Sequence, residues 1–396
     1  MKANKQFENL GNSYLFAEIA ARVAAYKHGH PGQKILRLGI GDVTLPLPRA
    51  AVDAMAAANA EMLDKSTFRG YGENAGEDFL LFAIKKYYAD TKNVKLDTND
   101  IFVSDGAKSD CAAILSLFDA DNTVLLPDPV YPAYVDINVM DGRRVAYVNG
   151  TFENGFLPTP DGVKDADIIY ICSPNNPTGA VYDFAGLKAW VDFANKTGAV
   201  ILYDAAYEGF IRDKNLPTSI YQIEGAQNCA IEICTFSKLA GFTGTRLGWT
   251  VVPSDLERDG ANLRRNWARR RSAAYNGAPY VIQRGGAAVL SGEGLAQARE
   301  NIAYYLGNAK ILRDALTNMG IELIGGDNAP YIWLKCPKGY KSWDYFDLLL
   351  NQAQVVGTPG AGFGVQGEGF LRLSSFGSRE DVTEAVERIG ALKKLG

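Results

Sequence analysis

Histidine is scarce in this sequence of 396 residues. The chain holds only His28 and His30, both in the turn-like segment KHGHPG. A Ser-His-Asp triad, a histidine metal site or a histidine general base would have to use one of these two residues. We therefore predict no metal site. We expect any proton transfer to use lysine, tyrosine or carboxylate side chains.

Paired cysteines, long apolar runs and a large excess of charge are also absent. The five cysteines are scattered and never in a C-x-x-C spacing, which predicts reduced thiols and neither a disulfide frame nor a zinc site. No apolar run reaches the roughly 20 residues that span a bilayer. The segment MKANKQFENLGNSYLF lacks the apolar core of a signal peptide. We expect a cytoplasmic protein.

The charge balance argues against two classes of partner. The sequence has 41 basic and 45 acidic residues, a formal net charge of -4, so neither nucleic acid nor an anionic membrane is an expected partner. The densest basic run, LRRNWARRR at 263–271, is typical of a solvated helix face or of an interface edge. The segment GFGVQG at 362–367 matches the letters of the dinucleotide-binding motif G-x-G-x-x-G. It precedes the predicted strand FLRLSSF instead of a helix, so we interpret it as a chance match.

From residue 100 onward, short apolar strands alternate with helical segments. This alternation predicts a parallel sheet that is covered on both faces. After about residue 280 a long helical segment at 295–319 is followed by short strands, as in an α+β domain. We predict an α/β protein with a large domain, built on a mostly parallel sheet flanked by helices, and a smaller α+β domain made from both chain ends. The predicted limits are 1–45 and 286–396 for the small domain and 46–285 for the large one.

Polar residues follow the predicted strands in the segments DGAKSD, DPVYPAY, SPNNPTG, DAAYEG and TFSK. The carboxyl ends of parallel strands form one ligand-binding rim, so these segments are expected to lie together. The segment GAKSD opens a helix, whose N–H groups favour a phosphate. Thr235 and Ser237 add hydroxyl groups, and Arg246 adds a guanidinium.

The remaining rim residues suit the aromatic part of a phosphorylated cofactor. Tyr131 could stack on a planar ring. Asp204 ends a strand, where its carboxylate could hold a ring nitrogen protonated. Lys238 could attack a carbonyl carbon if burial or nearby positive charge keeps its amine partly neutral.

Three of these segments, SPNNPTG, YDAAY and FSKLAGFTGTRLGW, closely resemble fold type I aminotransferases, which depend on pyridoxal 5'-phosphate (PLP). Further segments resemble the LL-diaminopimelate aminotransferase branch of that family: LRLGIGDVTLPLP, FVSDGAKSDC, DPVYPAYVD and TPGAGFGVQGEGFLRLSSFG. The resemblance covers nearly the whole chain. It implies a homodimer that interconverts LL-2,6-diaminopimelate and 2-oxoglutarate with tetrahydrodipicolinate and glutamate, in lysine biosynthesis, by a ping-pong Schiff-base mechanism.

The resemblance also implies roles for individual residues. Lys238 would bind the cofactor covalently and move the substrate proton, Asp204 would pair with the ring nitrogen, and Tyr207 would contact the ring oxygen. The other cofactor-binding residues would be Tyr71 of the neighbouring subunit, Ala107, Lys108, Tyr131, Asn176, Thr235, Ser237 and Arg246. Arg372 would bind the substrate carboxylate, and the rest of the substrate pocket would comprise Tyr14, Gly41, Lys108, Tyr131, Asn176 and Asn276, the last from the partner subunit.

One segment departs from the branch. An acidic residue usually stands three places after the tyrosine of the G-Y-G motif, where GYGENAG has Asn74, with Glu73 beside it. That acid would recognise the distal ammonium of diaminopimelate, and losing it could cost about 1–3 kcal/mol. Either Glu73 takes over this role after a small shift of the loop, or the preferred substrate differs. A different amino-acid substrate, or another PLP-dependent activity of the same fold, therefore stays open.

Overall fold

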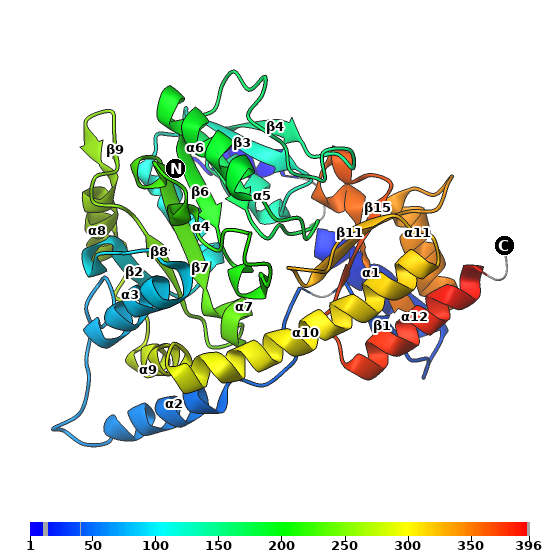
Figure 1. Cartoon of the computed structure of the whole chain (residues 1–396), viewed down its shortest axis with the longest axis horizontal. Coiled ribbons are helices and arrows are strands. Elements are labelled where there is room, and N and C mark those ends of the chain that lie inside the picture. Colours follow the sequence, from blue (N-terminus) through cyan, green and yellow to red (C-terminus); the bar gives the residue numbers. More distant parts are fainter. Residues whose placement is uncertain (11–14, 40, 394–396) are drawn as a thin grey trace.

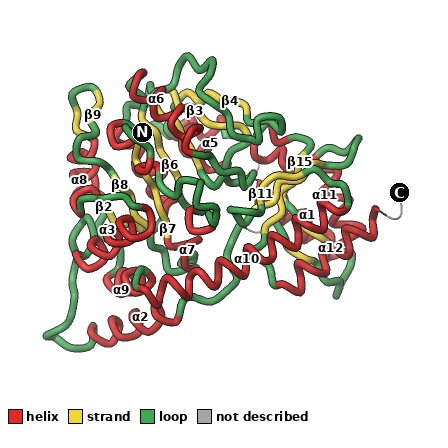
Figure 2. The backbone as a smooth tube through the Cα atoms, viewed as in Figure 1, coloured by secondary structure: helices red, strands yellow, loops and turns green. Residues whose placement is uncertain are grey.

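The computed structural model describes residues 1–10, 15–39 and 41–393 and contains two main groups of strands joined by the long helix α10 (Gly292–Asn318) (Figures 1 and 2). Strands β9 (Glu257–Arg258) and β10 (Ala261–Asn262) form a separate antiparallel pair. Tyr14, one of the predicted site residues, lies outside the described residues. Among the residues described, no helix is both long and apolar enough to cross a membrane.

The larger group of strands is a seven-stranded sheet in the order β2-β8-β7-β6-β5-β3-β4. The bounds along the chain are β2 (Ile101–Ser104), β3 (Thr123–Asp128), β4 (Arg144–Asn149), β5 (Ile168–Cys172), β6 (Val200–Asp204), β7 (Ala230–Thr235) and β8 (Gly248–Val251). Every residue of β5, β6 and β7 is buried, as their continuous apolar runs predict. Strand β4 has only exposed and half-buried residues, and the sequence analysis does not predict it.

Strands β4, β3, β5, β6 and β7 run parallel, whereas β8 is antiparallel to both of its neighbours. The antiparallel direction of β8 follows from the short helix between β7 and β8, α7 (Phe236–Ala240). Its length of about 8 Å cannot carry the chain back along a strand of about 20 Å. The chain instead turns back beside β7, and the N–H of Phe236 donates to the carbonyl of Leu247 at 3.0 Å. The predicted α/β class with a mostly parallel sheet is confirmed.

Helices pack around this sheet and share its hydrophobic core. They are α2 (Arg49–Glu61), α3 (Asp78–Lys92), α4 (Ala107–Ala113), α5 (Pro132–Met140), α6 (Phe184–Thr197), α8 (Leu263–Ala274) and α9 (Tyr280–Val289). Arg271 departs from the expected solvated helix face or interface edge of the basic run on α8, because it is buried. Leu263, Trp267 and Arg271 recur every four residues on one buried face, and Arg271 donates there to the carbonyls of Val103 and Asn74.

The smaller group of strands belongs to a second hydrophobic core, made from both ends of the chain. Its strands are β1 (Leu36–Arg37), β11 (Leu323–Gly325), β12 (Tyr331–Lys335), β13 (Val355–Val356), β14 (Thr358–Pro359) and β15 (Phe370–Ser374). The helices beside them are α1 (Leu15–Gly29), α11 (Ser342–Leu348) and α12 (Arg379–Lys393). This arrangement matches the expected α+β character. The domain limits at residues 45 and 285 stay a prediction, because α10 contacts elements of both groups.

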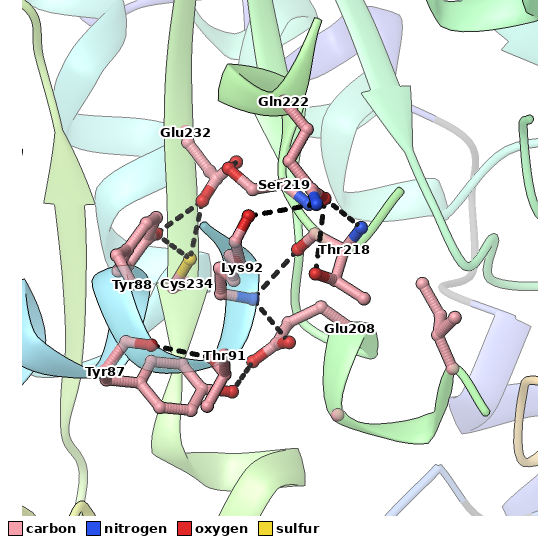
Figure 3. A network of polar contacts seen from close by, with 12 residues as sticks. Tyr87, Tyr88, Thr91, Lys92, Glu208, Thr218, Ser219, Gln222, Glu232 and Cys234 are labelled. Carbon is pink, nitrogen blue, oxygen red and sulfur yellow. Dashed lines mark hydrogen bonds and ion pairs between the residues drawn. The ribbon is translucent and has the colours of Figure 1, made fainter. Parts of the chain in front are cut away.

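A buried polar network holds the turn that follows β6 (Figure 3). The Lys92 amine at the end of α3 donates to the Glu208 carboxylate at 2.6 Å and to the Thr218 carbonyl at 2.9 Å. The Tyr87 hydroxyl donates to the same carboxylate at 2.6 Å. Glu208 directly follows Tyr207, so the network fixes the backbone beside a residue predicted to lie in the active site.

Replacing Lys92 with Met is expected to lower the free energy of unfolding by about 3–5 kcal/mol, because it leaves the Glu208 carboxylate buried without its cation. Lys86→Met on the same helix is the matched control, since the Lys86–Asp90 pair is exposed and contributes at most about 1 kcal/mol. Denaturant titration measures both changes. Equal losses in the two variants would contradict the assigned importance of the buried pair.

Candidate active site

The loops at the carboxyl ends of the large sheet surround a cavity of about 580 Å³. The strand register explains why they meet there, since Asp204 is paired with Cys172 on one side and with Ile233 on the other. The chain leaves β6 toward Tyr207 and leaves β7 toward Lys238, and both side chains line the cavity. Gly41 and Arg372 close it from the small group of strands.

One end of the cavity is built to hold an anion. Ala107, Lys108, Thr235, Ser237 and Arg246 line it. The Arg246 guanidinium donates to the Ser237 hydroxyl and to the Thr243 carbonyl, both at 3.3 Å. Thr235 caps α7 by accepting from the N–H of Ser237 at 3.1 Å. Together, these residues join a cation and hydroxyl groups to the first N–H groups of α4.

The backbone around Arg246 is adapted to this end of the cavity. Arg246 itself has a φ of 61°, in the left-handed region that non-glycine residues seldom adopt. Gly106, just before α4, has no side chain where a Cβ would collide with the Arg246 guanidinium. The glycine therefore lets the guanidinium approach the start of α4 closely.

Asp204 lies at the floor of the cavity, where it is buried. It accepts a hydrogen bond from the Tyr134 hydroxyl and another from the N–H of Ala206 at 2.9 Å. Burial raises the pKa of Asp204, and these two donors act in the opposite direction. The sequence analysis missed Tyr134. The sequence signal that could have found it is its spacing from Tyr131. Tyr134 follows three residues later, in the first turn of α5, and such residues lie on the same side of a helix.

The Lys238 amine points across the cavity and donates to the carbonyl of Gly41 at 2.5 Å. Burial lowers its pKa to about 8, Asp42 opposes this change, and the guanidinium groups of Arg372 and Arg246 add to it. A substantial fraction of this amine is therefore neutral near physiological pH. A neutral amine can act as a nucleophile or as a general base.

Arg372 on β15 is almost completely buried, with 1% of its surface exposed. It donates to the side-chain oxygen of Asn176 at 2.6 Å and to the carbonyl of Gly39 at 2.9 Å, while its Nε has no partner. Among the described parts of the chain, no ion pair involves Lys238, Arg246 or Arg372. A cavity with three such cations favours a ligand that brings negative charge to both ends.

Tyrosines from the two groups of strands meet beside Arg372. The hydroxyl of Tyr207 lies 2.7 Å from the hydroxyl of Tyr331, the first residue of β12. Tyr331 also lines the cavity. The sequence analysis missed it because it opens an ordinary apolar strand, YIWLK, with no polar neighbour to distinguish it.

Two predicted site residues lie away from the cavity, and Tyr14 is not among the described residues. Tyr71 is 89% exposed on the loop after α2, and Asn276 is also exposed. Glu73 is exposed as well, whereas the Asn74 amide donates to the Ser272 hydroxyl at 3.3 Å. The described lining of the cavity in one chain therefore lacks Tyr71, Glu73, Asn74 and Asn276.

Comparisons with known proteins agree with this geometry. Residues 33–389 match the family described as aminotransferase class I and II. The chain is 49% identical to the LL-diaminopimelate aminotransferase of Agathobacter rectalis, over 98% of this chain and 99% of that protein. It is 48% identical to the enzyme of that name from Bacteroides thetaiotaomicron, over 98% of both chains.

A solved structure gives the same result in three dimensions. The L,L-diaminopimelate aminotransferase from Chlamydomonas reinhardtii matches with a TM-score of 0.93 and 43% identity, over 99% of this chain and 98% of that chain. Sequence and fold therefore agree along the full length. The chain belongs to the LL-diaminopimelate aminotransferase branch of the class I and II aminotransferases.

Proposed function

We propose that this enzyme is a PLP-dependent aminotransferase that interconverts LL-2,6-diaminopimelate and 2-oxoglutarate with tetrahydrodipicolinate and glutamate. The observation that carries the proposal is the placement of Lys238. Its partly neutral amine lies in one cavity with the anion-binding end at Arg246, the buried carboxylate of Asp204 and the buried guanidinium of Arg372. The substrate assignment rests on the similarity to relatives that bear the name.

The residues present fit PLP. The Arg246 end, with Thr235, Ser237 and the start of α4, suits a phosphate dianion. Asp204 would face the ring nitrogen, Tyr207 and Asn176 the ring oxygen, and Tyr131 the face of the ring. When bound, PLP supplies the electron sink that stabilises negative charge at the substrate Cα.

The residues of the chain itself would carry out the binding and proton-transfer steps. Arg372 would hold the substrate α-carboxylate with its planar guanidinium, whose buried Nε has no other partner. The neutral amine of Lys238 would take the proton from the substrate Cα and deliver it to C4′ of the cofactor. The cavity walls from both groups of strands would limit the access of water.

The distal end of the substrate is less completely accounted for. Lys108 lines the cavity and could bind the second carboxylate that diaminopimelate and glutamate share. The distal ammonium of diaminopimelate needs a carboxylate, and Asn74 replaces the acid that the branch usually has there. Glu73 of a neighbouring subunit could take over this role. Transamination of a different amino acid, or another PLP-dependent reaction, remains the alternative.

We expect LL-diaminopimelate and glutamate each to convert the PLP-loaded enzyme to its amine form in a single turnover. The amino group of either donor passes to the cofactor, which changes the visible absorption spectrum. Stopped-flow spectra with each amino acid, alongside Lys238→Ala as the inactive control, measure this. A reaction with glutamate but none with LL-diaminopimelate would overturn the substrate assignment and leave the aminotransferase activity intact.

We further propose a homodimer with shared active sites, in the cytoplasm. Helix α2 and the loop after it project from the large domain (Figure 1), and this loop exposes Leu63, Phe68 and Tyr71. Large apolar side chains exposed together are typical of an interface. Tyr71 and Asn276 lie outside their own cavity and would reach that of the partner. The five cysteines are all free thiols, which suits a reducing compartment.

Mixing two inactive variants tests the shared sites. Tyr71→Ala and Lys238→Ala should each be nearly inactive, and refolding an equal mixture should recover about a quarter of wild-type activity, because half of the dimers then hold one intact site. Mixing without exchange of subunits is the control. A mixture that stays as inactive as its components would show that Tyr71 does not serve the partner's site.

The low pKa of Lys238 predicts how PLP is captured. Only the neutral amine reacts, so the rate of covalent capture by the apoenzyme should rise with pH. The midpoint of this rise should lie at about pH 8, and the rate should level off above it. Asp42→Asn should move this midpoint to lower pH, because the Asp42 carboxylate stabilises the ammonium form. Titration of PLP itself is common to both proteins and cancels in the comparison. An unchanged midpoint in Asp42→Asn would contradict the assigned electrostatics.

A further inference from the structure

Tyr331 is a buried tyrosine of the small group of strands that contacts two predicted site residues at once. Only 1% of its surface is exposed. Its strand, β12, pairs with β15 so that Trp333 lies opposite Arg372, which makes Tyr331 a diagonal neighbour of Arg372 on the same face of the sheet. Its hydroxyl crosses to the large group of strands and meets Tyr207. Tyr331 therefore lies where the two parts of the chain close the cavity.

The ring of Tyr331 supports the guanidinium of Arg372. The guanidinium carbon lies 4.4 Å from the ring centroid, within the range of a cation–π interaction. The ring also packs edge-on against Phe376 and Tyr207, with centroids 6.1 and 5.2 Å away. Because these aromatic contacts leave little freedom to the ring, the ring limits the tilt that the guanidinium can adopt toward a carboxylate.

The hydroxyl of Tyr331 orients the hydroxyl of Tyr207. The two oxygens are 2.7 Å apart, and either group can donate. The adjacent guanidinium draws electron density from the Tyr331 ring, so Tyr331 is the better donor of the two. If Tyr331 donates, the oxygen of Tyr207 is the acceptor and its own proton is directed away from Tyr331. That proton can then be donated to an anionic oxygen of a ligand in the cavity.

We propose that Tyr331 is a positioning residue that couples the substrate carboxylate clamp, Arg372, to the cofactor contact, Tyr207. Its ring fixes the guanidinium and its hydroxyl directs the Tyr207 proton toward the ring oxygen of PLP. The inference rests on the proposed use of PLP at this site.

A double-mutant cycle tests the hydroxyl. The hydrogen bond from Tyr207 stabilises the anionic ring oxygen most when the Lys238 nitrogen that binds PLP is unprotonated. Weakening that bond should therefore raise the pH midpoint of the visible band of bound PLP. Tyr331→Phe is expected to raise it by about one pH unit, a tenfold change in proton affinity. In a Tyr207→Phe background the same substitution should have no further effect, because Tyr331 acts through Tyr207.

The matched control is Tyr345→Phe, a buried tyrosine on α11 in the core of the small group of strands, whose loss should leave the midpoint unchanged. The hydroxyl's role would be overturned if Tyr331→Phe left the midpoint at its wild-type value. It would also be overturned if Tyr331→Phe shifted the midpoint by the same amount in the Tyr207→Phe background. If the wild-type protein binds no PLP, the proposed function fails instead. The two failures are therefore distinguishable.

Binding of maleate, an unreactive dicarboxylate, tests the ring. Tyr331→Phe keeps the ring and should change the dissociation constant less than twofold. Tyr331→Leu removes the ring and should raise it about fivefold, the effect of losing one cation–π contact. Calorimetry measures both constants, and the melting temperature of each variant shows whether the fold is retained. Equal constants in Tyr331→Phe and Tyr331→Leu, with both proteins folded, would overturn the ring's role.

Discussion

The active site depends on the register of three parallel strands, β5, β6 and β7. Cys172, Asp204 and Ile233 lie side by side in this register, so the chain leaves all three strands at one rim. A slip by one residue would turn Asp204 to the opposite face of the sheet and remove the carboxylate from the cavity floor. The buried apolar surface of the strands fixes the register, and the network of Lys92 and Glu208 then holds the turn that carries Tyr207. The geometry of the site is therefore a consequence of core packing.

The charges at that rim explain the choice of ligand. Lys238, Arg246 and Arg372 form no ion pairs among the residues that have been described, although Arg372 is buried and Lys238 has a pKa lowered by burial. Burying cations without partners costs free energy, which an anionic ligand recovers on binding. The phosphate of PLP and the carboxylate of an amino acid would supply charge at the two ends where the cations lie. Stability given up by burying these cations thus becomes affinity for cofactor and substrate.

The sequence predicts the residues at the rim of the sheet and misses the tyrosines that hydrogen-bond to them. Continuous apolar strands followed by polar segments predict the sheet and bring Lys238, Asp204 and Arg246 to one rim, because strand ends are readable from composition. Tyr134 and Tyr331 were missed, since one lies within a helix and the other opens an apolar strand, and only the tertiary structure brings their hydroxyls to Asp204 and Tyr207. Strand β8 runs antiparallel because of the short helix before it. The burial of Arg271 depends on Val103, a residue remote in sequence.

The central claim is that the amine of Lys238, and no other amine in the cavity, binds PLP. Lys108 lines the same cavity and is the natural competitor. The direct measurement is the mass of the PLP-loaded protein after borohydride reduction, followed by proteolysis and mapping of the modified peptide. The account predicts one reduced PLP group per chain, located on Lys238. A protein that gains no mass, or that carries the group on Lys108, would contradict it.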